Sequence, residues 1–150
     1  MMTLQQISDR LELEQLTIDY AHAIDRGEVD RLDDIFLPNA EIDCTLTGGI
    51  RVKYPEIREW LRHATCAFGN TQHLVTNHQF SVDGDKAIGR ILCFNPIEWP
   101  DSDAPPARQV VFLALWYHDK YVRTDDGWRI ATRTEEPWLN HNVPTGVLPK

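Results

Sequence analysis

The chain has 150 residues, of which 42% are hydrophobic and 25% charged, and its formal net charge is −8. This length fits one domain over residues 1–150 with a core large enough for a pocket, and the composition excludes disordered and fibrous classes. The negative charge argues against nucleic acid or an anionic membrane as a partner, because both attract clustered Lys and Arg. An acidic soluble protein remains.

The cysteines and the N-terminus bear on the cellular location. Cys44, Cys66 and Cys93 are far apart and include no C-x-x-C pair, so neither a disulfide framework nor a zinc knuckle is indicated. The start MMTLQQISDR lacks an apolar signal segment, and the longest strongly apolar run, 110–117, is too short to span a bilayer. We therefore expect reduced thiols and a cytoplasmic protein.

The first half of the chain is predicted to be mainly helical. Residues 4–26 contain no Gly or Pro and carry two apolar flanks, which predicts a long first helix. A short second helix is expected over GEVDRLDDIFLP, followed by a brief strand over 40–46. A third helix is expected over 55–68, because proline suits the first helical turn.

The second half is predicted to be β. Turn-forming VDGD, WPDSDAPP and TDDG separate four strands, over 71–82, 86–99, 107–123 and 128–137. Three helices followed by a meander of long strands predict an α+β fold, in which a curved antiparallel sheet packs around three N-terminal helices. The last dozen residues, LNHNVPTGVLPK, are expected to form a tail or a lid.

One carboxylate of the first helix stands where an apolar residue is expected. Asp25 follows Ile7, Leu11 and Ile18 at a spacing that keeps all four on one side of an α-helix. Burying an ionised carboxylate there is costly unless a partner supplies hydrogen bonds or charge, so we expect a partner. The alternative is a helix cap, since D-R-G-E places Glu28 in a capping-box pattern for the second helix.

The segments EQLTIDYAHAIDRGEVDRLDDIFLPNAEID, NTQHLVTNH and DDGWRIATR, with helices and strands in this order, resemble the SnoaL-like branch of the NTF2-like superfamily. Within it, the chain is similar to the group of scytalone dehydratase, hexachlorocyclohexane dehydrochlorinase and bile-acid 7α-dehydratase. These are cofactor-independent lyases with a conical pocket between sheet and helices. The resemblance implies an NTF2-like cone, a small-molecule substrate, no cofactor, and a homo-oligomer, either a dimer or a trimer.

The resemblance also implies a partner for Asp25. The group shares an Asp at the end of the first helix and a His in a T-x-H or T-Q-H strand, and Asp25 and His73 hold these positions. A neutral imidazole can take a proton and return it, while a carboxylate on its far nitrogen fixes the tautomer and stabilises the imidazolium. Alternatively, His73 is a polar strand residue, because Leu74, Phe80 and Val82 alternate on the opposite face.

Two further residues match this group. Tyr20 matches a tyrosine of the bile-acid enzyme and could donate to a departing hydroxyl or a carbonyl oxygen, or could be an ordinary core tyrosine. Arg133 is predicted on the opposite strand face from Ile130, where its forked donors could hold a leaving group or a developing oxyanion. The alternative is a surface salt bridge to Glu135 or Glu136.

Aromatic and histidine positions complete the candidate site. Tyr117 and Tyr121 share one face of a predicted strand and are candidate substrate-binding walls, with core packing as the alternative. His73 and His78 are five residues apart, which in a regular strand sends them to opposite faces, so they make a poor metal pair. No metal site, phosphate loop or serine-hydrolase motif is predicted.

Together these residues predict a cofactor-free lyase that eliminates water or halide from a small cyclic or hydroaromatic substrate. His73 removes a proton beside an activating group, Asp25 orients it, and Arg133 and Tyr20 stabilise the negative charge that develops on oxygen. The alternatives are a ketosteroid-isomerase-like or polyketide-cyclase-like reaction and a noncatalytic ligand-binding domain. A pocket with His73 facing into it would favour an enzyme.

Overall fold

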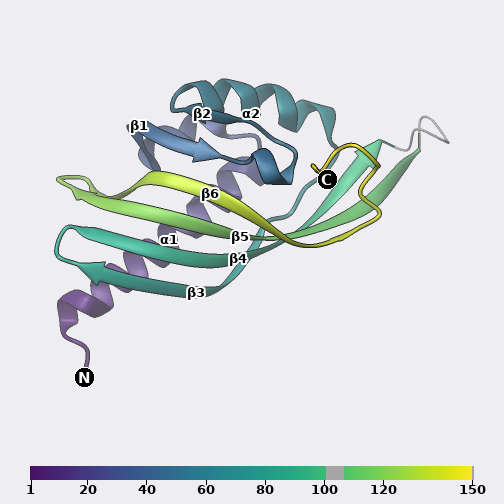
Figure 1. Cartoon of the computed structure of the whole chain (residues 1–150). Helices are drawn as coiled ribbons and strands as arrows, with labels where there is room; N and C mark the ends of the chain where they lie inside the picture. The colour runs from purple at the N-terminus through teal and green to yellow at the C-terminus, as the bar shows by residue number, and fades with distance from the viewer. Residues whose placement is uncertain (101–106, 150) are drawn as a thin grey trace.

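In the computed structural model, which describes residues 1–100 and 107–149, a long N-terminal helix crosses one face of a six-stranded sheet (Figure 1). The helical elements are α1 (Leu4–Asp25), the 3-10 helices η1 (Val29–Asp34) and η2 (Thr45–Thr47), and α2 (Glu56–Ala67). The strands are β1 (Phe36–Asp43), β2 (Arg51–Lys53), β3 (Leu74–Asp83), β4 (Lys86–Pro100), β5 (Arg108–Thr124) and β6 (Gly127–His141). The predicted α+β class is confirmed. No helix in this described part is long and apolar enough to cross a membrane.

The strands form one sheet in the order β2-β1-β6-β5-β4-β3. The meander from β3 to β6 is antiparallel, as predicted, and β2 is antiparallel to β1. β1, however, pairs with β6 in parallel. The sheet is therefore mixed, because the chain leaves β1, crosses over through β2 and α2, and enters the meander at the far edge.

The predicted second helix is replaced by the 3-10 helix η1 and the start of β1. Val29 and Leu32, three residues apart, are both buried, and the side chains at this spacing stack directly in a 3-10 helix. The chain then turns into the sheet at once, since the Ile130 amide donates to the Ile35 carbonyl at 2.8 Å. The three predicted helices thus correspond to two α-helices and a 3-10 turn.

The buried face of α1 differs from the predicted stripe. Ile7 and Leu11 are 42% and 61% exposed, so the expectation that Asp25 continues a buried stripe was wrong. The sheet covers mainly the other flank of the helix, whose buried residues include Leu13, Leu16, Thr17, Tyr20 and Ile24. Asp25 is drawn into the protein because it is the last residue of α1, directly before the turn at Gly27 (φ 67°).

A β-bulge in β3 places two histidines on the same face. The register with β4 shifts next to Asn77, whose φ is 51°. His73 bonds Asp25, and His78 Nε2 lies 2.8 Å from Thr17 Oγ1, so both rings face α1. The prediction that their five-residue spacing sends them to opposite faces was wrong, because the bulge adds a residue and resets the alternation.

A second bulge acts in the same way on β6. The register with β5 skips Ala131, and Trp128, Ile130 and Arg133 are all buried. Arg133 was predicted on the opposite face from Ile130, which holds only for an uninterrupted strand. The extra residue turns the guanidinium into the interior instead.

Candidate active site

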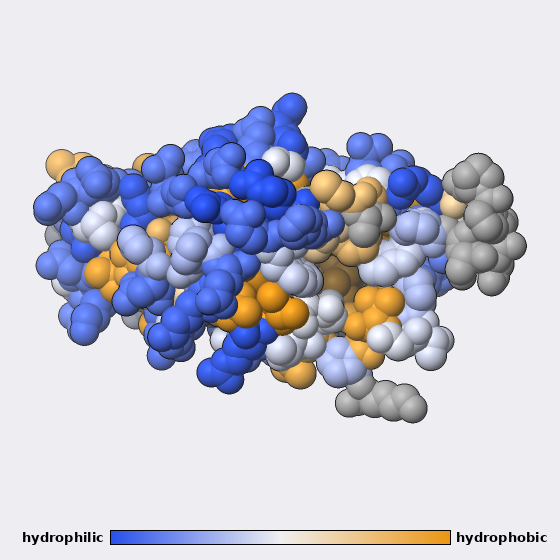
Figure 2. Space-filling view, turned by 90° about the horizontal axis from the view of Figure 1, so that it is seen from above, coloured by the Kyte–Doolittle hydropathy of each residue, from blue (hydrophilic) through white to orange (hydrophobic). Residues whose placement is uncertain are grey.

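A cavity of about 190 Å³ lies between the sheet, the end of α1, α2 and the C-terminal segment. Its wall is mainly apolar, and on the face over α2 apolar atoms gather around a hollow (Figure 2). Because an apolar cavity of about 150 Å³ can hold benzene, this one has room for a single substituted ring. From the predicted tail or lid, Val143, Val147 and Leu148 lie in the cavity wall, whereas 139–141 belong to β6.

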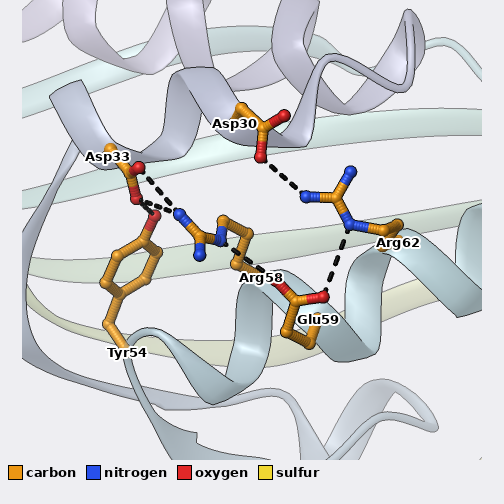
Figure 3. A network of polar contacts seen from close by, with 6 residues as sticks. All are labelled: Asp30, Asp33, Tyr54, Arg58, Glu59 and Arg62. Carbon is orange, nitrogen blue, oxygen red and sulfur yellow. Dashed lines mark hydrogen bonds and ion pairs between the residues drawn. The ribbon is translucent and has the colours of Figure 1, made fainter.

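Ion pairs hold α2 against the cavity (Figure 3). Arg58 Nη1 lies 2.7 Å from both carboxylate oxygens of Asp33, and Arg62 Nη2 lies 2.6 Å from Asp30 Oδ1. Glu59 accepts from both arginines at 3.3 and 3.4 Å. The network ties the polar side of α2 to η1. The apolar side of α2 is thereby kept on the cavity, to which it contributes Ile57, Trp60, Leu61 and Ala64.

Asp25 contacts His73, and His73 lines the cavity. Asp25 Oδ1 lies 2.6 Å from His73 Nδ1, and Oδ2 accepts from the His73 backbone amide at 2.8 Å. Thr71 Oγ1 also donates to Oδ1, at 3.1 Å. The expected contact is present, and Asp25 is not the cap of η1, because the N-cap there is Glu28 and it makes no side-chain capping bond.

The surroundings of Asp25 keep it ionised. Burial raises the pKa of this carboxyl, but the ring and backbone hydrogen bonds and the charge of His73 and the hydroxyl of Thr71 outweigh burial, so the pKa lies below its ordinary 3.8. An ionised carboxylate accepts Nδ1–H and directs the proton chemistry of His73 to Nε2. His73 lines the cavity, which gives that chemistry a place to occur.

Asn95 lies against Nε2 of His73, with its side-chain amide 3.0 Å away. With the amide oxygen toward Nε2, the amide nitrogen can donate to Thr71 Oγ1 and to the carbonyl oxygens of Gln72 and Pro96, at 3.2 to 3.3 Å. This orientation satisfies both ends of the amide. Asn95 then accepts from Nε2–H, the proton that His73 carries after acting as a base.

Asn95 was not predicted as a site residue, although the sequence carries a signal for it. It alternates along β4 with Ile91, Cys93 and Ile97, which are all buried and apolar. A polar residue in a buried apolar row requires a partner. Here that partner is the catalytic candidate His73.

Tyr20 and Tyr117 line the cavity, and Arg133 is stacked between their rings. The guanidinium carbon lies 4.1 Å from the Tyr20 ring centroid and 4.0 Å from that of Tyr117. The Tyr20 and His73 rings meet edge to face at 6.4 Å between centroids. Burial raises the pKa of both phenols above the ordinary 10.0, so both keep their protons at neutral pH.

Arg133 and Tyr121 lie behind the cavity wall. Arg133 Nε and Nη2 donate to Asp119 Oδ1 and Oδ2 at 2.8 and 2.6 Å, and Tyr121 Oη donates to Asp119 Oδ2 at 2.8 Å. The ion pair of Arg133 is thus with Asp119, and the alternative of a surface pair with Glu135 or Glu136 was wrong. Neither Arg133 nor Tyr121 is in the cavity wall, so this geometry does not offer the direct substrate contacts predicted for them.

Glu135 is a wall residue that the sequence analysis did not assign to the site. It lies two residues after Arg133, pairs across the sheet with Tyr117, and lines the cavity. Thr47 Oγ1 donates to its Oε2. Burial raises the pKa of Glu135 above its ordinary 4.5, and the Thr47 hydrogen bond and the charges of Arg133 and His73 only partly oppose this.

The cavity offers little support for metal or thiolate chemistry. Among the described residues, no three His, Cys, Asp or Glu side chains come together to hold a metal ion. Cys44 lines the cavity, but burial raises the pKa of its thiol to about 11, so it is not a thiolate nucleophile at neutral pH. The titratable groups that line the cavity, which include His73, Tyr20 and Glu135, are of the kinds that accept or donate protons.

Residues 5–134 match the SnoaL-like domain family. Among its relatives are uncharacterized proteins of Mycobacterium bovis and Mycobacterium tuberculosis, each 45% identical over 135 residues that cover 90% of this chain and 89% of theirs.

Similar solved structures share the whole architecture. The Kfla4162 protein of Kribbella flavida is 26% identical with a TM-score of 0.81, and the match covers 90% of this chain and 94% of that one. A candidate scytalone dehydratase from Novosphingobium aromaticivorans is 17% identical with a TM-score of 0.83, over 98% and 95% of the two chains. A hexachlorocyclohexane dehydrochlorinase from Novosphingobium barchaimii is 21% identical with a TM-score of 0.78, over 95% and 94%. This chain belongs to the SnoaL-like family and has the NTF2-like α+β fold.

Proposed function

We propose that the protein is a cofactor-independent lyase that eliminates water or halide from a small cyclic substrate, with His73 as the general base. The observation that carries this proposal is the 2.6 Å contact between Asp25 Oδ1 and Nδ1 of a histidine that lines a cavity. The fold is shared with proteins named as a candidate dehydratase and a dehydrochlorinase, which agrees with elimination chemistry.

The reaction would begin with proton abstraction by His73 Nε2 from a carbon next to an electron-withdrawing group. Asp25 orients the ring and offsets the imidazolium charge, and the Asn95 oxygen accepts from the new Nε2–H. Positioned general-base catalysis contributes roughly 10²–10⁴-fold, so the remaining acceleration must come from orientation and electrostatics in the cavity.

Tyr20 is the proposed donor to the oxygen of the electron-withdrawing group. Its ring adjoins His73 at the cavity wall, and its raised pKa keeps the phenol protonated and able to donate. Arg133 acts through the tyrosines rather than on the substrate. Stacked between the rings of Tyr20 and Tyr117, it fixes their orientation and places a positive charge behind the site.

The test is turnover of a panel of cyclic ketones that carry a hydroxyl or a halogen on the β carbon, followed by mass spectrometry. The wild type should form products lighter by one water or one hydrogen halide, and His73→Ala should be at least about 10²-fold slower. His78→Ala is the matched control, because His78 contacts Thr17 and does not line the cavity. It should keep turnover.

Two outcomes would contradict the proposal. Products of unchanged mass would assign an isomerase, which begins with the same proton abstraction. If the protein binds the ketones tightly but forms a product from none of them, it is a ligand-binding domain.

A further inference from the structure

Elimination of a hydroxyl group differs from elimination of a halide in what the leaving group needs. Hydroxide is a strong base and leaves slowly unless it is protonated as the carbon–oxygen bond breaks. Halide leaves as a weak base and needs no proton. The presence of a proton donor in the cavity wall therefore separates the two substrate classes that the proposed function leaves open.

We propose that Glu135 is the general acid of the site, so that the natural substrate is a small cyclic alcohol with its hydroxyl β to a carbonyl, rather than a halide. This inference rests on the proposed function, because it assigns the second proton transfer of the same elimination.

The position of Glu135 suits a proton donor. The side chains of Glu135 and His73 line the same 190 Å³ cavity. Glu135 lies on β6, and His73 is the residue directly before β3. Thr47 occupies Oε2, while Oε1 has no hydrogen-bond partner in the described part of the chain and is not among the enclosed atoms there. One carboxyl oxygen is thus held and the other is free to meet a ligand.

No cation of the described residues pairs directly with this carboxyl. The nearest guanidinium along the strand, Arg133, is committed to Asp119 through Nε and Nη2, and no ion pair of Glu135 exists among the described residues. A carboxyl desolvated without a paired cation favours its neutral form, and burial is indeed the largest influence on the raised pKa of Glu135. The titratable groups around it are His73, Arg133, Asp119, Tyr20, Tyr117, Cys44 and Cys93.

The other acids in the wall suit the role less well. The phenols of Tyr20 and Tyr117 hold their protons above the ordinary pKa of 10.0, and the pKa of Cys44 is about 11. General acids work best when their pKa lies near the working pH. The pKa of Glu135 is raised by burial from an ordinary 4.5, so its shift is toward neutral pH, whereas the pKa values of the phenols and the thiol are shifted away from neutral pH.

The step balances without any further reactant. His73 Nε2 takes the proton from the carbon next to the carbonyl, the carbon–carbon double bond forms, and the carbon–oxygen bond breaks. The Oε1 proton of Glu135 passes to the leaving oxygen, which departs as water. The imidazolium and the carboxylate left behind return to their starting forms when His73 passes its proton to Glu135 through the released water.

The experiment compares 3-hydroxycyclohexanone with 3-fluorocyclohexanone, because fluorine is close in size to hydroxyl but leaves as a weak base. Glu135→Gln keeps the shape of the side chain and removes its acidic proton. We expect it to lower water elimination by roughly 10²-fold or more and to change fluoride release by less than about threefold. Glu136→Gln is the matched control, since Glu136 is the next residue and pairs with His118 at 2.6 Å. It should leave both rates unchanged.

Equal loss of both reactions in Glu135→Gln, or loss of neither, would overturn the assignment of Glu135. If the wild type converts neither ketone, the proposed function fails for β-substituted cyclic ketones. The protonation of Glu135 is then tested separately, by measuring the stability of the wild type and of Glu135→Gln against pH. An acid with a raised native pKa keeps its proton after the unfolded chain has lost it, so wild-type stability falls relative to Glu135→Gln as pH rises above 4.5. Parallel stability curves from pH 4.5 to 8 would overturn the neutral carboxyl.

Discussion

Two inward contacts between a carboxylate and a nitrogen-bearing side chain have similar geometry and different surroundings. In both the closest nitrogen–oxygen distance is 2.6 Å, between His73 and Asp25 and between Arg133 and Asp119. The side chains of the first pair are 11% and 17% exposed, whereas those of the second are fully enclosed at 0%. A short carboxylate–nitrogen contact therefore does not by itself mark the reactive site. What distinguishes His73 is that its ring lines a cavity, where a substrate can reach it.

The enclosed pair has a structural role. Its charges are fully removed from water, and the two flanking tyrosines and Tyr121 leave no access for a ligand. Breaking such a pair leaves an uncompensated charge in the interior, whereas the open pair can exchange its proton with a substrate. The comparison predicts that damage to the enclosed pair reduces stability first, and that damage to the open pair reduces turnover first.

The largest effect on stability is expected for Asp119→Ala. The variant strands the Arg133 guanidinium at 0% exposure, so the free energy of unfolding should fall by about 3–5 kcal/mol in a denaturant titration. Asp85→Ala is the control, because Asp85 is 80% exposed and pairs with Arg123 at the surface, where about 0–1 kcal/mol is typical. A loss for Asp119→Ala as small as that of the control would remove the distinction between the two pairs.

A smaller but specific effect is expected for Asn95→Asp. A carboxylate 3.0 Å from Nε2 would hold a proton on that nitrogen more strongly than the neutral amide oxygen of Asn95 does, so the ring would stay charged and could not act as a base. Turnover should fall roughly 10²-fold with the fold retained, as checked by steady-state kinetics and circular dichroism. Wild-type turnover in Asn95→Asp would show that Nε2 is not the reacting nitrogen.

The smallest effect is expected in the acid dependence of stability. The pKa of Asp25 is lower in the folded protein than its ordinary 3.8, so this carboxylate contributes stability at neutral pH that is lost as pH falls from about 3.8 through the lowered value. Asp25→Asn should therefore be less stable than the wild type at pH 6, and the difference should shrink below pH 3.8. A constant difference across this range in thermal melts would contradict the lowered pKa.

The sequence was sufficient for the order of the main helices and strands, although not for η2 and β2, and for the antiparallel meander and the partnership of Asp25 and His73. That partnership was deduced from a buried stripe that α1 does not have, together with the family resemblance. The deduction reached the right partner because Asp25 ends the helix, where a carboxylate turned inward needs compensation as much as one on a buried face.

The rest of the site depends on the register between neighbouring strands. The two-residue alternation along a single strand does not determine that register. The bulges at Asn77 and Ala131 reverse the faces expected for His78 and Arg133, and each arises from pairing with a neighbouring strand. The parallel contact of β1 with β6 is equally non-local. Glu135 was considered only as a surface partner of Arg133, because its place in the cavity follows from the same shift in β6.

The most direct test of the account is turnover of Asp25→Asn on whichever β-substituted ketone the wild type converts, with thermal melts run beside it. If Asp25 orients a catalytic imidazole, turnover should fall roughly 10²–10⁴-fold while the fold persists, because an amide cannot offset the imidazolium charge. The double variant with His73→Ala should be no slower than the poorer single variant, since the two residues act as one unit. Wild-type turnover in Asp25→Asn would contradict the dyad.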